Sequence, residues 1–268
     1  MTRLRHILVH LDGGDAAAAR LGLAAALAAR EGARLLGAFA EHGFPHRAGL
    51  KPGWTEADHD RAATASRARF AEATRGLADA EWRDLSAATP GEAADAVIAA
   101  CRTADLAVIG QAGAKGGLAP PDLAELTVRN AGRPVLVVPY AGVPETLGAR
   151  PVFAWNGSRE AARALHDALP LLAPEARAVV ITVRADAGSG ADADVLAQLR
   201  RHGVSARGDV LRAGGVGLMD LLLNRIADLG GDLLAMGAYG HYGFPHLARG
   251  GGTRHVLAHM TVPVLFSR

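Results

Sequence analysis

Glycines gather in the C-terminal part of the chain at spacings that suit a phosphate group. Two residues separate Gly237 from Gly240, and nine more separate Gly240 from the run Gly250, Gly251, Gly252 and Thr253. Because glycine lacks a Cβ, backbone N–H groups can approach a ligand there, and consecutive N–H groups at a helix N-terminus bind anions. The threonine hydroxyl can donate to a phosphate oxygen or cap the helix. Arg249 and Arg254 flank the run, so this stretch predicts a phosphate-binding loop.

The first half of the chain carries a degraded version of the same stretch. Gly110 and Gly113 repeat the first glycine pair, but Leu123 stands where the third glycine is expected. The segment 120–125 (PPDLAE) has two prolines without N–H groups and two acidic residues. We infer that the first half has lost phosphate binding, and that this loop either packs structurally or covers the other half.

Composition excludes several classes of protein. Half of the 268 residues are apolar and 21% are charged, so the chain can bury a core and is not largely disordered. The net charge of +2, without blocks of like charge, does not indicate nucleic acid. No apolar stretch reaches the roughly 20 residues of a membrane helix, and Cys101 is the only cysteine. We expect a soluble cytoplasmic protein without nucleic-acid or membrane partners.

An internal repeat sets the architecture. Three strand-like segments recur in the same order in both halves. The pairs are DLAVIG (105–110) with DLLAMG (232–237), PVLV (134–137) with PVLF (263–266), and HILVHLDG (6–13) with PVFAWNG (151–157). The last pair aligns Asp12 with Asn156. We place the extra length of the first half in a Gly- and Pro-containing loop at about 43–60.

Helical patterns lie between these strands. Asp15 is expected to cap a helix that runs to about Arg30, and Ser158 is expected to cap the matching helix of the second half. Further strands are expected at 33–40 and 177–183, and further helices at about 91–103 and 217–229. Alternating strands and helices predict a parallel sheet. The fold class is α/β, with two tandem open parallel-sheet, Rossmann-like units, 1–142 and 150–268, packed as a pseudo-two-fold pair.

The glycine loop and the repeated strands resemble the universal stress protein family, whose loop reads G-x2-G-x9-G-[S/T]. The resemblance covers essentially the whole chain as two tandem copies. It implies an adenine nucleotide alpha hydrolase-like fold and bound ATP, ADP or AMP, with Mg2+ as a companion. Gly251 departs from the pattern, because the family has Ser or Thr there, and Thr253 is a substitute for the missing hydroxyl.

The resemblance also places further contacts in the second unit. Asn156 stands where the family has an acidic residue near the nucleotide, while the first unit keeps Asp12. Adenine is expected to meet main-chain groups near Val183, and Met236 and Ala238 are expected to flank the base or the phosphate path. The complete set of expected nucleotide-binding residues is Asn156, Val183, Met236, Gly237, Gly240, His241, Gly250, Gly251, Gly252 and Thr253.

These residues predict a cytoplasmic stress-response protein that binds an adenine nucleotide in its second unit and acts as a sensor or regulator. The motif positions no acid, base or nucleophile, so efficient catalysis is not implied, and slow ATP hydrolysis or autophosphorylation stays open. The alternative is a ligand-free protein-interaction module with two degenerate pockets. An adenylating enzyme or a flavoprotein relative is disfavoured because the chain has no P-loop. Protein partners are unspecified, and the repeat leaves a pseudo-dimer within one chain and a homodimer open.

Several residues have two readings. Asn156 either binds the ligand or shapes the turn before the next helix, and Trp155 either lines the pocket or packs in the core. Cys101 is expected to be a buried, unreactive thiol. His255 and His259 have a spacing that a metal pair can use, but no third ligand accompanies them, so no metal site is expected.

Overall fold

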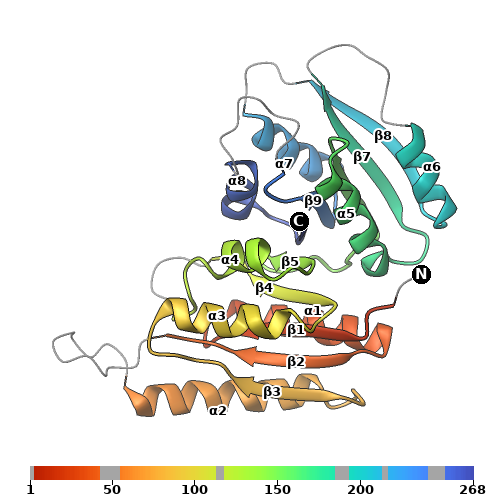
Figure 1. Ribbon diagram of the computed structural model, residues 1–268. Coiled ribbons are helices and arrows are strands. Elements are labelled where there is room, and N and C mark those ends of the chain that lie inside the picture. The colour runs from red at the N-terminus through yellow and green to blue at the C-terminus, as the bar shows by residue number, and fades with distance from the viewer. Residues whose placement is uncertain (1–2, 43–54, 113–117, 185–192, 213–216, 241–250) are drawn as a thin grey trace. The chain divides into compact units, whose positions relative to one another are not determined.

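The computed structural model describes residues 3–42, 55–112, 118–184, 193–212, 217–240 and 251–268 (Figure 1). The chain divides into two compact units, an N-terminal unit, Arg3–Gly142, and a C-terminal unit, Val143–Arg268. Each unit contains parallel strands alternating with helices, which confirms the α/β class.

The strands of the N-terminal unit are ordered β3-β2-β1-β4-β5, and every neighbouring pair is parallel. Strand β1 occupies the centre and is buried except at its first residue, which explains why its sequence is almost continuously apolar. The elements are β1 (His6–Leu11), α1 (Ala16–Glu31), β2 (Arg34–Phe39), α2 (Glu56–Ala73), β3 (Ala80–Asp84), α3 (Pro90–Cys101), β4 (Leu106–Gly110), α4 (Leu123–Asn130) and β5 (Val135–Val138).

The C-terminal unit has the matching order β8-β7-β6-β9-β10, again with parallel neighbours. Strand β6 takes the central place that β1 has in the other unit. The elements are β6 (Pro151–Trp155), α5 (Arg159–Ala168), the short 3-10 helix η1 (Leu169–Leu171), β7 (Arg177–Arg184), α6 (Ala193–Arg201), β8 (Ser205–Arg212), α7 (Leu218–Asp228), β9 (Leu233–Gly237), α8 (Gly251–His259) and β10 (Val264–Ser267).

Helices cover the sheet of the N-terminal unit in two pairs. Because the strand order reverses after β3, right-handed crossovers place α1 and α2 on one face and α3 and α4 on the other. The packing of α1 against α2, and of α3 against α4, agrees with this assignment (Figure 1). Within the described residues, no helix has the length and apolarity needed to cross a membrane.

The repeated Asp of DLAVIG and DLLAMG has the same structural role in both units. Asp105 accepts hydrogen bonds from the backbone N–H groups of Arg5 (2.8 Å) and His6 (3.0 Å), which precede and open β1. Asp232, which is 2% exposed, accepts from the N–H groups of Ala149 (2.8 Å) and Arg150 (2.9 Å) just before β6. Each carboxyl therefore fixes the start of the central strand, β1 or β6, beside the strand that follows the aspartate, β4 or β9.

Some local expectations were wrong. Asp15 makes no side-chain cap, because it already has helical backbone angles, whereas Ser158 does cap α5 by accepting from the N–H of Ala161. Residues 56–60 of the expected loop belong to α2, which begins with a capping box formed by Thr55 and Asp58. The sequence reading also missed α2, β3, α6 and β8. Strand β3 shows why: it lies at the sheet edge with mostly exposed residues and has no apolar run.

We predict that Asp232→Ala destabilises the C-terminal unit. The substitution removes the acceptor for two backbone N–H groups and for the Thr146 hydroxyl, which donates at 2.9 Å. Hydrogen bonds to charged groups contribute about 1.5–3 kcal/mol each and are not additive, so we expect a loss of about 3 kcal/mol in the free energy of unfolding. Chemical denaturation followed by circular dichroism measures this loss.

The matched control is Asp228→Ala, at the exposed end of α7, which should change the free energy of unfolding by less than about 0.5 kcal/mol. Equal stability of the two variants would contradict the role assigned to Asp232.

Candidate functional site

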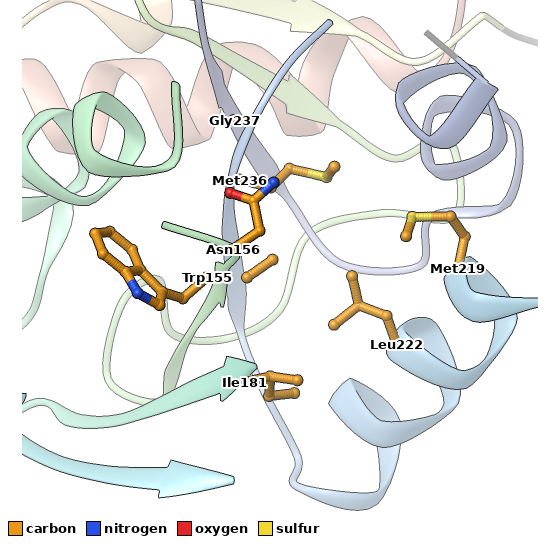
Figure 2. A pocket seen from close by; sticks show the side chains of 8 residues that line it. Trp155, Asn156, Ile181, Met219, Leu222, Met236 and Gly237 are labelled. Carbon is orange, nitrogen blue, oxygen red and sulfur yellow. The ribbon is translucent and has the colours of Figure 1, made fainter. Parts of the chain in front are cut away.

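The strand order reverses between β6 and β9 in the C-terminal unit, and ligands of open parallel sheets bind at such a point. A small cavity of about 60 Å³ lies there (Figure 2). Its lining is mostly apolar, and α7 supplies two of the side chains. The lining residues are Ala154, Trp155, Asn156, Ile181, Met219, Leu222, Met236 and Gly237.

Asn156 shapes the turn before α5, as one of its two interpretations expected, and it also lines the cavity. Its Oδ1 accepts from the N–H of Ser158 at 3.1 Å, and Ser158 Oγ accepts in turn from the N–H of Ala161 at 3.1 Å. The Asn156 side chain thus shapes the turn before α5, and Asn156 is also one of the residues that line the cavity. Trp155 lines the same cavity, and its side chain is labelled beside Asn156 in Figure 2.

The glycine at the end of β9 is required by packing. A Cβ on Gly237 would lie 2.6 Å from the backbone N of Ala161, so only glycine lets β9 approach the first turn of α5 so closely. A Cβ on Gly240 would lie 3.1 Å from Oε2 of Glu160. Gly237 therefore has a structural reason in addition to any contact with a ligand, whereas a small shift of the Glu160 side chain would accommodate a Cβ at Gly240.

Thr253 holds the backbone of the loop. The residue is 4% exposed, and its Oγ1 accepts a hydrogen bond from the N–H of Tyr239 at 3.2 Å. Tyr239 has a positive φ of 53°, a strained conformation for a residue that is not glycine. The threonine hydroxyl thus stabilises a strained turn between Gly237 and Gly240.

The structure describes some of the remaining expected site residues, and others lie outside the described ranges. Met236 lines the cavity, and Gly251 and Gly252 form the partly exposed start of α8. Val183 lies near the end of β7, opposite Leu211 of β8. His241 and Gly250, together with Arg249, lie outside the described residues. Ala238 is fully buried, and its N–H donates to the carbonyl of Ser267 at 2.8 Å.

Glu160 is a site residue that the sequence reading missed. It is 4% exposed, and its Oε1 accepts from Nε of Arg159 at 2.6 Å. Burial on its own raises the pKa of Glu160, but the hydrogen bond from Arg159 and further hydrogen bonds outweigh burial and hold this pKa below its usual value. A buried carboxylate therefore faces the Gly237–Gly240 turn. Its position in the first turn of the helix that follows the central strand could have suggested it.

The N-terminal unit has a larger cavity at its own reversal point, beyond the ends of β1 and β4. Its volume is about 590 Å³, and its lining includes five ionisable side chains from three segments: His10, Asp12, Asp15, Arg20 and, after β2, Glu41. The other lining residues are Gly14, Ala16, Gly110, Gln111, Ala112, Leu118, Ala119, Pro120, Pro121, Leu123, Ala124 and Tyr140.

Arg20 organises the polar side of this cavity. The side chain is 3% exposed, its Nε donates to the carbonyl of His10 at 2.6 Å, and its Nη2 donates to Oδ2 of Asp12 at 2.7 Å. A Cβ on Gly110 would overlap Nη1 of Arg20. The glycine at the end of β4 therefore makes room for a buried guanidinium group at the edge of the cavity.

The two neighbours of Arg20 have shifted pKa values. Burial, aided by the positive charge of Arg20, lowers the pKa of His10 to about 4 against the opposing effect of Asp12, so His10 is neutral at pH 7. Burial also favours the neutral form of Asp12, but Arg20 leads the interactions that hold the pKa of Asp12 below its usual value. Asp12 and Arg20 therefore form an ion pair, and Asp12 also accepts from the N–H of Gly14 at 2.8 Å.

Glu41, directly after β2, is a further carboxyl that the sequence reading missed. It is 3% exposed, and its Oε1 accepts from the N–H of Gly13 at 2.6 Å. Its Oε2 has no hydrogen-bond partner among the described residues. Burial raises the pKa of Glu41, and the nearby charges of Asp12 and Asp84 add to that effect. Only its position at the end of an expected strand could have pointed to this residue.

Histidine and cysteine chemistry is limited in the described part of the chain. No group of three or more His, Cys, Asp or Glu side chains there could hold a metal ion. Nε2 of His255 lies 2.8 Å from Oδ1 of Asp220, and the His255 ring stacks on His259. Cys101 is fully buried, and burial raises the pKa of its thiol to about 12, which makes it unreactive.

We predict that Gly110→Ala expels the Arg20 guanidinium from its position. The added methyl group overlaps Nη1, so the bonds to Asp12 and to the His10 carbonyl must break or shift. We expect the free energy of unfolding to fall by about 1–3 kcal/mol, measured by chemical denaturation. The control is Gly22→Ala on the exposed face of α1, where an added Cβ meets nothing within 4 Å. This control should gain up to about 1 kcal/mol, and a similar gain for Gly110→Ala would contradict the prediction.

Comparison with known proteins places this geometry in a known fold. No model of a protein family matches the sequence, and no curated protein matches it. A universal stress protein from Archaeoglobus fulgidus has a TM-score of 0.70 at 16% identity, with 98% of this chain and 96% of that chain covered. A putative universal stress protein from Pseudomonas aeruginosa has a TM-score of 0.62 at 15% identity, with coverages of 98% and 93%. Over nearly its whole length, the chain has the fold of universal stress proteins.

Proposed function

We propose that this chain is a stress-response protein of the universal stress type that binds an adenine nucleotide, ATP, ADP or AMP, in its C-terminal unit. The observation that carries the proposal is the apolar cavity at the reversal point of β6 and β9, next to a turn of two glycines. An adenine nucleotide has a flat apolar base and anionic phosphate groups, so it needs an apolar surface next to a turn that can receive the phosphates.

In this proposal the adenine ring packs against the apolar lining of the cavity, whose side chains move apart to admit it, because about 60 Å³ is less than a ligand pocket commonly measures. Ile181, Met219, Leu222 and Met236 present hydrocarbon and thioether groups from two strands and one helix (Figure 2). Thioether groups make favourable contacts with aromatic rings, so the two methionines suit a purine. Main-chain groups near Val183 and the amide of Asn156 supply hydrogen bonds to the base or the ribose.

The phosphates lie toward the start of α8. Gly251 and Gly252 leave the first N–H groups of this helix accessible, and a helix N-terminus favours anions. Gly237, Gly240, His241 and Gly250 complete the phosphate path in this proposal. Thr253 acts indirectly, since its hydroxyl holds the backbone of Tyr239.

Mg2+ fits this arrangement for an electrostatic reason. Glu160 places a carboxylate beside Gly240, where it would repel a bare phosphate group. Mg2+ binds carboxylate and phosphate oxygens together and removes this repulsion. In the proposal Glu160 therefore helps to hold the metal ion.

The biological role follows from binding. No residue is assigned a catalytic role, so nucleotide occupancy is the signal that a sensor or regulator would pass to a protein partner in the cytoplasm. Slow ATP hydrolysis is the most that this site would support.

We predict that Gly251→Asp weakens ATP binding. A carboxylate at the helix start opposes the phosphates, and like charges near a surface cost enough to reduce affinity by about tenfold or more. Acidic residues in a first turn stabilise helices, so the variant should fold. Isothermal titration of the full chain with ATP and Mg2+ measures the change.

The matched control is Gly91→Asp in the first turn of α3, where an added side chain meets nothing within 4 Å. It should bind ATP like the unmodified protein. Absence of ATP binding by the unmodified protein at millimolar concentration would overturn the proposal and favour a protein-interaction module. Equal affinity of the two variants would overturn the assignment to the C-terminal unit.

The role of Glu160 has its own test. Glu160→Gln keeps the shape and removes the charge, so ATP affinity without Mg2+ should rise, and the gain that Mg2+ brings should shrink by about tenfold. Titrations with and without Mg2+ measure both quantities. An unchanged Mg2+ effect would show that Glu160 does not help to hold the metal ion.

A further inference from the structure

The N-terminal unit contains a cavity of a size that suits a small organic molecule. Ligand pockets commonly measure about 300–1,000 Å³, and this cavity measures about 590 Å³. One wall is polar and carries Asp12, Arg20 and Glu41, while Pro120 and Leu123 belong to an apolar wall. A molecule that fits both walls has one polar end and an apolar body.

Glu41 determines what the polar end must be. Its carboxyl is nine-tenths buried, and Oε2 lacks a hydrogen-bond partner among the described residues. An unpaired buried acceptor costs about 1–3 kcal/mol, so a donor from outside the chain would stabilise it. Glu41 lines the cavity, and the terminal torsion of glutamate is soft, so the carboxyl can adjust to meet a donor placed there.

The charge balance favours a cation as that donor. Among the described lining residues, Asp12, Asp15 and Glu41 contribute three carboxyl groups, while Arg20 contributes the one cation, because His10 is neutral at pH 7. The guanidinium of Arg20 is already committed to Asp12 and to a carbonyl. An ammonium group therefore gains Coulomb attraction here, and a carboxylate or phosphate group is repelled.

Phosphate is excluded for a second reason. Pro120 and Pro121 have no N–H groups to offer, and the first turn of α4 carries Glu125 after Asp122, which opposes an anion at that helix start. The cavity therefore differs in chemistry from the site proposed in the C-terminal unit.

Tyr140 indicates the nature of the apolar body. It lines the cavity and is 60% exposed, the one large hydrophobic side chain so exposed in the described part of the chain. Its backbone is held by the side chain of Gln111, whose Oε1 accepts from the Tyr140 N–H at 3.2 Å. An aromatic ring on the ligand would stack on Tyr140 and cover it.

We propose that the N-terminal cavity binds a small aromatic amine, with its ammonium group donating to Glu41 and its ring packed against Tyr140. This site is separate from nucleotide binding and does not depend on it.

The experiment uses three probes that share one ring and differ in the charge of the head group: tyramine, the neutral alcohol tyrosol, and anionic para-hydroxyphenylacetate. Isothermal titration of the full chain should show binding of tyramine. We expect tyrosol and para-hydroxyphenylacetate to bind about tenfold more weakly or not at all. ATP should not displace tyramine. Failure of tyramine to bind, equal binding of the three probes, or displacement by ATP would overturn the proposal.

Variants locate the bound probe. Glu41→Gln keeps the acceptor for the Gly13 N–H and removes the charge, so tyramine affinity should fall by about tenfold. Tyr140→Ala should also weaken tyramine. Asp95→Asn, an exposed carboxyl on α3, is the control for net charge and should leave binding unchanged.

The melting temperature distinguishes a ligand-binding role of Glu41 from a purely structural one. Because this buried carboxyl lacks a full set of partners, Glu41→Gln should melt no lower than the unmodified protein while binding tyramine more weakly. A variant that keeps full tyramine affinity would overturn the assignment to Glu41.

Discussion

The parallel pairing of one central strand with a neighbour on each side is the constraint on which each unit depends. Strand β1 pairs with β2 and β4, and β6 pairs with β7 and β9, so the carboxyl ends of three strands meet at one edge. The connections leave that edge in opposite directions and open a space between them. Asp105 and Asp232 fix the opposite edge by binding the N–H groups that precede the central strands. The residues that directly follow these three strands are thereby brought together in each unit, irrespective of residue type.

The two units use this shared geometry with different charges. In the N-terminal unit Arg20 of α1 places its guanidinium group against Gly110, and this group pairs with Asp12. In the C-terminal unit the backbone of the first helix approaches Gly237 directly, and Glu160 supplies a carboxylate near Gly240. The repeated scaffold therefore carries a buried arginine paired with Asp12 at one reversal point and a buried glutamate paired with the exposed Arg159 at the other. This contrast lies in the helices that follow the central strands, and the glycine loops alone do not reveal it.

The repeat, the parallel α/β class and the central elements could be predicted from the sequence, because buried strands and amphipathic helices have strong hydrophobic periodicity. Strand β3 and helix α2 escaped because they lie at the sheet edge, where β3 is mostly exposed and α2 buries only a few of its residues. Asn156, Met236 and Gly237 do line one cavity, since motif spacing fixes residues at strand ends. Arg20, Glu41 and Glu160 could not be found that way. Their importance comes from burial, and for Arg20 and Glu41 also from partners 8 to 28 residues away, which no local pattern encodes.

The glycines show where motif reasoning reaches its limit. Gly110 and Gly237 stand at equivalent strand ends, and at both positions an added Cβ would collide with the chain itself: with a guanidinium in one unit and with helix backbone in the other. Glycine at this position is therefore explained by internal packing before any ligand is considered. The distinction between the units must come from the start of the later helix. There α8 begins with two glycines, whereas α4 follows two prolines and carries acidic residues. Acidic residues at the start of α4 oppose an anion there, whereas the glycines of α8 add no such charge, and this difference supports our proposals of phosphate in the C-terminal unit and a cation in the N-terminal one.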